Sequence, residues 1–255
     1  TWLVQRKAYL ENFKELSVYK RQSEIKIDGV LDEADWKNTD ALSDFRVSKD
    51  VVSTHETSVR VTYDADHLYL AVTAMEKTPE KMIIGEPSPD ATDVHELGDR
   101  LELFYNYPDM SDAAYHLCVN AKGFLMAARQ NSTSDRVPFK TSAKCATKVY
   151  SDRWTLEIAI PCNEVGQQCF DGGTWKLNVA RERLTTDSPR RKDGSRMTES
   201  SSCCRGEFHG PANFINVKFT PERAKGMSQG CDVSGWKNAN FDRNRKLDPR
   251  DKARY

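Results

Sequence analysis

Residues 57–74 read TSVRVTYDADHLYLAVTA, and this stretch decides the fold class. Apolar side chains occupy every second position along 59–63, and the same spacing resumes along 68–74. The polar segment 64–67 between the two runs has the composition of a turn. Two alternating runs joined by a short turn are typical of a β-hairpin with one buried face.

Similar short segments recur along the chain without long helical patterns between them, which predicts an all-β fold. We expect an antiparallel β-sandwich of about ten strands with a jelly-roll or immunoglobulin-like arrangement. We expect the sandwich over residues 24–220, a short N-terminal helix or extension over 1–23, and an irregular C-terminal tail or linker over 221–255. Two polar segments, 76–98 and 185–206, are expected to be long loops, the second protruding. The further strands are predicted at Leu101–Tyr105, Tyr115–Val119, Phe124–Ala128, Ala143–Tyr150, Trp154–Ile160, Trp175–Arg183 and Phe214–Phe219.

The charge balance limits the classes of partner. The chain has 38 basic and 38 acidic residues, so it has no net charge to attract a phosphate polymer, and no nucleic acid is expected as a partner. No apolar run approaches the ~20 residues that a membrane-spanning helix needs, so no membrane span is expected. No signal peptide opens the sequence, and we expect Thr1 to begin a mature or truncated product.

Seven cysteines are spread along the chain without a CxxC pair, and the chain has five histidines. That pattern does not favour a zinc site. The cysteines are either scattered thiols or partners in disulfides, and an exported protein would favour disulfides. Cys162 and Cys169 are close enough to close a small loop, and Cys118 and Cys145 lie in segments that could be neighbouring strands. The connectivity stays open.

No enzyme is expected, because the sequence has no GxSxG, GxGxxG, P-loop or HExxH motif. A carboxylate pair for glycoside cleavage depends on the fold rather than on spacing, so a hydrolase hidden in the sandwich stays an alternative. Asp28, Asp32, Glu33 and Asp35 cluster around Trp36, and we interpret them as turn residues and a helix cap.

The tail contains a possible calcium loop. Asn240, Asp242, Asn244 and Asp251 stand at positions 1, 3, 5 and 12 of an EF-type loop. Arg245 replaces the glycine that such a loop has at position 6, and neighbouring cations oppose calcium binding. Asp242, Asn244 and Asp251 are therefore either ligands of a structural calcium ion or solvated residues of a tail.

A series of short motifs runs through residues 24–220. It begins with Ile25-Lys26-Ile27-Asp28-Gly29 and Trp36 and continues with Asp99–Phe104, Trp154–Pro161 and Phe208–Phe214. In residue types and order, this series resembles carbohydrate-binding module family 9 and its DOMON-like relatives. The resemblance implies a secreted or cell-surface β-sandwich that holds structural calcium, binds an oligosaccharide or polysaccharide without transforming it, and is tethered to other domains.

The sugar site of that family resembles a slot between two aromatic rings, with polar side chains below. The matching positions here are Glu102 and Asn120 for the polar groups, and His95 and Phe208 for the rings. Strand alternation independently places Glu102 and Asn120 on one face of the sheet. We expect this face to be open to solvent. A carboxylate and an amide there can form hydrogen bonds with sugar hydroxyls. Arg181 is either a rim residue or a further ligand.

Two departures from the pattern leave other functions open. Cys118 stands where the xylanase-linked type has an arginine, and one ring position of the slot falls near His95 or Glu96 rather than on a tryptophan. A structural domain that has lost the sugar site is therefore one alternative. The DOMON-like resemblance suggests another alternative, a haem-binding domain. In that case His116, with Met126 or Met75, would supply the axial ligands.

Overall fold

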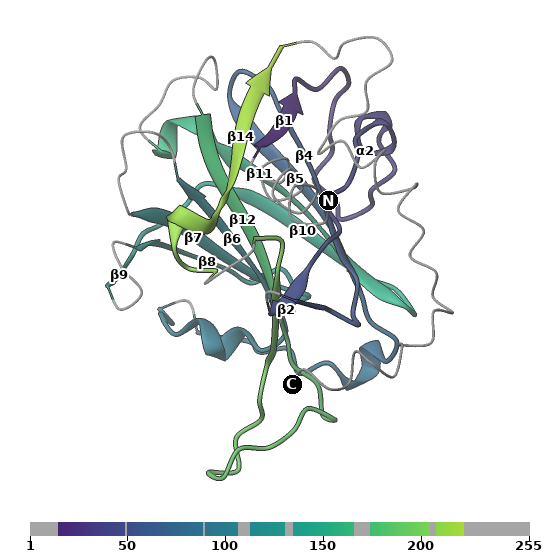
Figure 1. Ribbon diagram of the computed structural model, residues 1–255, viewed down its shortest axis with the longest axis vertical. Coiled ribbons are helices and arrows are strands. Elements are labelled where there is room, and N and C mark those ends of the chain that lie inside the picture. Colours follow the sequence, from purple (N-terminus) through teal and green to yellow (C-terminus); the bar gives the residue numbers. More distant parts are fainter. Residues whose placement is uncertain are drawn as a thin grey trace, which may run out of the picture.

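The computed structural model describes residues 15–48, 50–88, 90–106, 113–130, 135–165, 174–204 and 208–221. These residues form two β-sheets packed face to face, with one short α-helix and several turns of 3-10 helix (Figure 1). In chain order the elements are β1 (Glu15–Tyr19), α2 (Ala34–Asn38), β2 (Arg46–Ser48), β3 (Val51–Val52), β4 (Thr57–Tyr63), β5 (His67–Met75), η1 (Pro79–Lys81), η2 (Val94–Leu97), β6 (Arg100–Asn106), β7 (Ala114–Asn120), β8 (Leu125–Gln130), β9 (Arg136–Pro138), β10 (Lys144–Val149), β11 (Arg153–Pro161), η4 (Cys162–Val165), β12 (Thr174–Arg183), β13 (Glu199–Ser202), η5 (Pro211–Asn213) and β14 (Ile215–Thr220).

The larger sheet has ten strands and the smaller one has four. The order in the larger sheet is β3-β2-β13-β12-β6-β7-β8-β9, with β14 also paired to β12 and β1 to β14. The smaller sheet has the order β10-β11-β5-β4. Among these strand pairs only β1 and β14 run parallel, so the predicted antiparallel β-sandwich is confirmed.

Strands β4 and β5 form the hairpin predicted from the opening stretch. Val59 lies opposite Val72 and Val61 opposite Leu70, and all four side chains are at most 2% exposed. Asp64 closes the turn by accepting hydrogen bonds from two backbone amides. The alternation in the sequence therefore marks the face that lines the core, but β5 is buried on its other face too, since Tyr69 and Ala71 pack against Trp36.

One apolar core fills the space between the sheets. Trp154 from the smaller sheet and Tyr105 and Trp175 from the larger sheet are its largest rings, and Tyr105 stacks on Trp175 with 6.3 Å between centroids. Leu103 and Leu117, from neighbouring strands of the larger sheet, are fully buried. Each such side chain contributes about 1.5–3 kcal/mol when it leaves water, so this core fixes the relative placement of the sheets.

The expected N-terminal helix is wrong for the part of it that the structure describes. Glu15–Tyr19 is strand β1, and Leu16 and Val18 are 3% and 0% exposed in the core. Apolar residues at every second position fit a strand better than a helix, and β1 pairs in parallel with the distant strand β14. Residues 1–14 and the tail from 222 onward lie outside the described residues.

The segment before β2 packs on the outer side of the smaller sheet. Trp36 on α2 is 2% exposed there, and its indole N–H donates to Glu157 Oε1 at 2.8 Å. The backbone amides of Asp28 and Gly29 donate to the other carboxylate oxygen. Asp28 accepts from the backbone amide of Val30, as expected of a turn residue. Asp35 lies on α2 instead and accepts from the backbone amides of Gln22 and Ser23, and the N-cap residue Glu33 makes no side-chain capping hydrogen bond, so the predicted helix cap is wrong.

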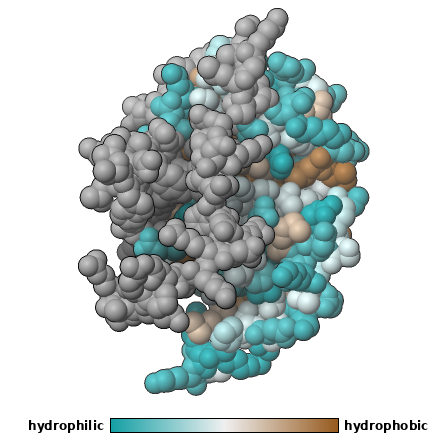
Figure 2. All heavy atoms as spheres, turned by 45° about the vertical axis from the view of Figure 1, so that its right-hand side comes forward, coloured by the Kyte–Doolittle hydropathy of each residue, from teal (hydrophilic) through white to brown (hydrophobic). Residues whose placement is uncertain are grey.

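Two long connections determine which surfaces stay open. The segment between β5 and β6 crosses the end of the larger sheet, where η2 contacts β7. The connection between β12 and β13 extends beyond the sandwich at the bottom of Figure 1, as predicted for part of 185–206. The side seen in Figure 2 is mostly hydrophilic where it is coloured, with apolar residues in small groups. Within the described ranges, no helix is long and apolar enough to cross a membrane.

Candidate functional site on the outer face of the larger sheet

The outer face of the larger sheet is the side of β6, β7, β8 and β12 that points away from the core. It carries the even-numbered residues of these strands, because the odd-numbered ones line the core. Glu102 lies opposite Cys118, and Arg100 lies opposite Asn120. Glu102 and Asn120 are therefore diagonal neighbours on one face, as strand parity predicted.

Four buried side chains form the outer-face cluster, which consists of Arg100, Glu102, His116 and Cys118. Arg100 donates to Glu102 Oε1 at 2.7 Å, and His116 Nε2 lies 2.8 Å from Glu102 Oε2. The Cys118 sulfur lies 3.0 Å from the same imidazole nitrogen. None of the four side chains is more than 3% exposed, so their mutual contacts replace contacts with water.

The charges in this cluster are fixed by its contacts. Burial alone would raise the pKa of Glu102, but hydrogen bonds and charges from His116 and Arg100 hold it at about 2. Burial lowers the pKa of His116, against the pull of Glu102. At neutral pH the carboxylate is thus ionised, and the guanidinium of Arg100 is the permanent cation beside it.

The expectation that Glu102 and Asn120 face solvent is wrong. Asn120 is 0% exposed, and its amide group donates to the carbonyl oxygens of Gly85 and Leu97. Its side-chain oxygen accepts from the backbone amides of Lys122 and Phe124. The connection between β5 and β6 covers this end of the face, a long-range contact that strand parity cannot reveal. Asn120 therefore holds a turn and a covering segment together.

An apolar flank borders the cluster on the side of η2. Val94 and Leu97 pack against Cys118, and each of these three residues is at most 6% exposed. His95, one of the predicted site residues, lies on the same turn but is exposed. The structure therefore places His95 beside the covered end of the outer face rather than inside it.

An aromatic flank borders the cluster on the opposite side. The half-buried ring of Phe208 lies 4.1 Å from the His209 ring and 6.1 Å from the Phe104 ring, centroid to centroid. His209 in turn lies 6.3 Å from His116. Asn178 donates to the Phe208 carbonyl and so fixes the backbone that carries this ring. Phe208 is thus linked to the His116 imidazole through the rings of His209 and Phe104.

Several polar atoms on the outer face have no hydrogen-bond partner among the described residues. They are Nδ1 of His116, Oε1 of Glu182, Oε1 of Gln130 and Nε of Arg136. All four residues belong to the outward row of their strands, as the strand register shows. Buried polar atoms are normally paired, so these atoms are candidates for bonds to a ligand or to water.

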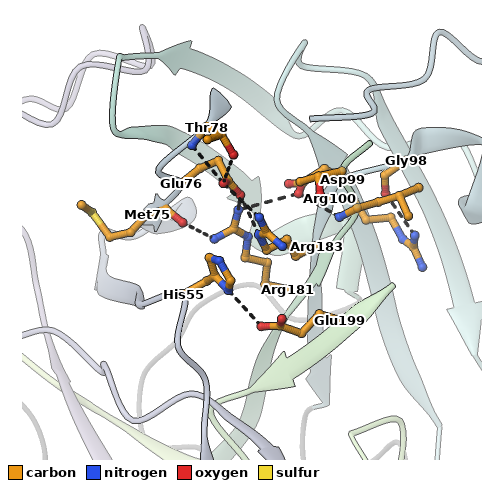
Figure 3. A network of polar contacts seen from close by, with 12 residues as sticks. His55, Met75, Glu76, Thr78, Gly98, Asp99, Arg100, Arg181, Arg183 and Glu199 are labelled. Atoms are coloured by element: carbon orange, nitrogen blue, oxygen red, sulfur yellow. Dashed lines mark hydrogen bonds and ion pairs between the residues drawn. The ribbon is translucent and has the colours of Figure 1, made fainter. Parts of the chain in front are cut away.

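Arg181 does not belong to this face. It points toward the end of the smaller sheet, where it donates to the Met75 carbonyl at 2.6 Å and contacts Glu76 at 3.3 Å (Figure 3). Arg183 also donates to Glu76, and Asp99 lies 3.7 Å from Arg181. We call Glu76, Asp99, Arg181 and Arg183 the inner ion network. Arg181 is 1% exposed, so it is neither a rim residue nor a ligand on the outer face.

A cavity of about 300 Å³ lies on the far side of the molecule, over the smaller sheet. It is lined by residues that include Trp36, Thr73 and Tyr150. The cations of Arg153 and Lys148 lie 4.7 and 5.4 Å from the centre of the Tyr150 ring. Because these cations already cover the ring, it is less available for stacking on a sugar than the ring of Phe208.

The cysteines do not support the expected strand-to-strand disulfide. Cys118 and Cys145 are both free, since Cys118 lies on the outer face of the larger sheet and Cys145 lies in β10 of the other sheet. Cys162 is buried at the end of β11, and its predicted partner Cys169 lies outside the described residues. The proximity of two strands in sequence was a poor guide, because they belong to different sheets.

Of the two methionines proposed as haem ligands, one shares a face with His116 and the other does not. His116 and Met126 share the outer face, but Met75 ends β5 in the smaller sheet, so it does not share a face with His116. The tail residues proposed for calcium, Asp242, Asn244 and Asp251, lie outside the described residues.

Sequence reasoning missed Arg100 and His209 as parts of the site, and it treated Cys118 only as a departure from the family pattern or a disulfide partner. Arg100 was available from parity, because it stands two residues before Glu102 on the same strand and must share its face. His209 follows Phe208 directly, but no pattern indicated that its ring would turn toward His116.

The family model described as carbohydrate family 9 binding domain-like matches residues 27–214. This chain belongs to that family. The match covers most of the chain and agrees with the series of motifs that gave the resemblance. The comparison does not show a DOMON-like relationship, which stays a prediction. No curated protein matches the family 9 chain.

Solved structures support the same fold. A family 9 carbohydrate-binding module from Caldicellulosiruptor kristjanssonii in complex with cellotriose has a TM-score of 0.57 and 13% identity, covering 84% of this chain and 97% of that one. The same kind of module in complex with glucose gives 0.55 and 14%, covering 83% and 98%. A Bacteroides uniformis protein named as a candidate carbohydrate-binding protein gives 0.61 and 20%, covering 81% and 99%. At these identities the likeness establishes the β-sandwich fold.

Proposed function

We propose that the chain is a non-catalytic carbohydrate-binding module that binds a glycan over the outer face of its larger sheet. The observation that carries this proposal is the position of the Phe208 and His209 rings beside a buried group of acid, guanidinium and imidazole side chains. Sugars present apolar CH faces to aromatic rings and hydroxyls to charged and amide groups. A face with both features suits a pyranose.

The hydrogen-bonding part of the site would be Glu102, oriented by Arg100 and His116, together with the unpartnered atoms of Glu182 and Gln130. Carboxylate and amide oxygens accept bonds from hydroxyl groups. His95, exposed at the margin of the face, is the candidate for a second ring.

Several broader properties belong to the same proposal because the family resemblance implies them. The module would act in a secreted or cell-surface protein, tethered to other domains. It would bind an oligosaccharide or polysaccharide without cleaving it. Structural calcium is part of this expectation, but Glu76 and Asp99 are poor candidates for it, since the guanidinium groups of Arg181 and Arg183 already neutralise them.

Isothermal titration calorimetry with glucose and cellotriose tests the proposal. Phe208→Ala should weaken binding about fivefold, since aromatic contacts contribute roughly 1 kcal/mol beyond area burial. Phe124→Ala is the matched control, because that exposed phenylalanine lies at the turn between β7 and β8. Tyr150→Ala tests the cavity over the smaller sheet. Binding that survives Phe208→Ala but fails in Tyr150→Ala would move the site to the smaller sheet.

A further inference from the structure

Three different ligand atoms converge inside the outer-face cluster. A carboxylate oxygen of Glu102, an imidazole nitrogen of His116 and the sulfur of Cys118 all lie within 4.8 Å of one another. Within the described part of the chain, this is the one group of three His, Cys, Asp or Glu side chains with that geometry. All three side chains are at most 2% exposed.

Hydrogen bonding alone does not account well for this arrangement. His116 Nε2 lies 2.8 Å from Glu102 Oε2 and 3.0 Å from Cys118 Sγ. An imidazole nitrogen carries either a proton or a lone pair, so it can donate to the carboxylate or accept from the thiol, but it cannot do both. One of the two buried contacts is therefore left without a full hydrogen bond.

A metal ion would satisfy all three atoms at once. We propose that Glu102, His116 and Cys118 form a binding site for one Zn²⁺ ion. Oxygen, nitrogen and sulfur ligands together suit zinc, which binds them in a tetrahedral arrangement at about 2.0–2.3 Å. In such a site, neighbouring ligand atoms are about 3.3–3.6 Å apart. Small side-chain movements from the observed 2.8 and 3.0 Å would open the required space.

The surroundings support a neutral zinc centre. Glu102 and a Cys118 thiolate would cancel the two positive charges of the ion, while His116 binds as a neutral imidazole. Arg100 holds the other oxygen of Glu102 at 2.7 Å, which leaves Oε2 directed toward the metal. Glu182 lies 3.8 Å from Arg100 and balances its charge. Three protein ligands leave the fourth position to water or another ligand.

The strand geometry explains the spacing of these ligands. His116 and Cys118 are two residues apart on β7, so their side chains lie on the same face, and Glu102 is directly opposite Cys118 on β6. Such a site needs no CxxC pair. The zinc site shares Glu102 and His116 with the proposed sugar site, but Cys118 belongs to the zinc site alone and Phe208 to the sugar site alone, so variants of these two residues test the proposals separately.

Cobalt substitution of the full-length protein tests the site. After removal of metal with a chelator, adding Co²⁺ to wild type should produce a near-ultraviolet thiolate-to-cobalt charge-transfer band, which saturates at one ion per chain and disappears when one equivalent of Zn²⁺ is added. Cys118→Ser should lose this band and bind Zn²⁺ at least about 100-fold more weakly. Cys145→Ser, the control at a free cysteine in the other sheet, should keep both properties.

Circular dichroism of each protein establishes that it is folded. If Cys118→Ser does not fold, His116→Asn replaces it and should also lose the band. Folded wild type that gives no band would overturn the proposal. A band that persists in folded Cys118→Ser would do the same, because the thiolate would then come from another cysteine.

Discussion

The inner ion network and the outer-face cluster lie on opposite faces of the larger sheet and have different chemistry. In the inner network, Glu76 is fully buried and accepts hydrogen bonds from Thr78, Arg181 and Arg183. These contacts join the end of β5 in the smaller sheet to β12 in the larger one. In the outer-face cluster, one guanidinium is accompanied by an imidazole and a thiol. The first set of residues therefore holds the sheets together, whereas the second offers ligand atoms.

This difference leads to a large expected effect on stability at Glu76. Glu76→Gln should lower the free energy of unfolding by about 3 kcal/mol, because it removes the buried carboxylate that the buried Arg181 and the partly buried Arg183 both contact. Urea unfolding at pH 7 measures this loss. The matched control is Glu80→Gln, at an exposed position, where we expect a change below about 0.5 kcal/mol. Equal stabilities of the two variants would contradict the structural role of the network.

The difference in unfolding free energy between wild type and Glu76→Gln should also depend on pH. Burial would raise the pKa of Glu76, but Arg183, Thr78 and Arg181 hold it at about 2, below the ordinary value of 4.5. A lowered folded-state pKa stabilises the protein above the unfolded value, and this stabilisation is lost as the pH falls through the folded one. The stability gap between wild type and Glu76→Gln should therefore be full above about pH 4.5 and shrink toward pH 2. A stability difference that stays constant between pH 4.5 and pH 2 would contradict the lowered pKa of Glu76.

A smaller effect is expected on the outer face. Glu182→Gln should cost about 1 kcal/mol or less, because one carboxylate oxygen is 3.8 Å from Arg100 and the other has no partner among the described residues. The same urea experiment provides the measurement. A loss as large as that of Glu76→Gln would show that both faces serve stability equally, and the distinction between them would fail.

Much of this architecture is readable from local patterns. The hairpin of β4 and β5 and the shared face of Glu102 and Asn120 follow from side chains that alternate in direction along a strand. Strand β1 could have been read in the same way, since Leu16 and Val18 alternate with polar residues, but its partner β14 is about two hundred residues away. Pattern alone gave no sign of that pairing.

The contacts that define the site are less predictable because they cross long stretches of chain. Asn120 is covered by Gly85 and Leu97, and Arg181 meets Glu76 from a strand in the other sheet. Parity places a side chain on a face but does not show what covers that face. The zinc ligands escaped notice for a related reason, since sequence motifs describe ligands close together in the chain rather than across two strands.

The central claim is that ligand binding belongs to the outer face of the larger sheet. The most direct test is a titration of isotope-labelled protein with cellotriose, followed by amide chemical shifts in nuclear magnetic resonance spectra. We predict that the largest shifts occur at Phe208, His209 and the adjoining residues of β6 and β7. Shifts centred instead on Thr73 and Tyr150, over the smaller sheet, or no shifts at saturating sugar, would contradict it.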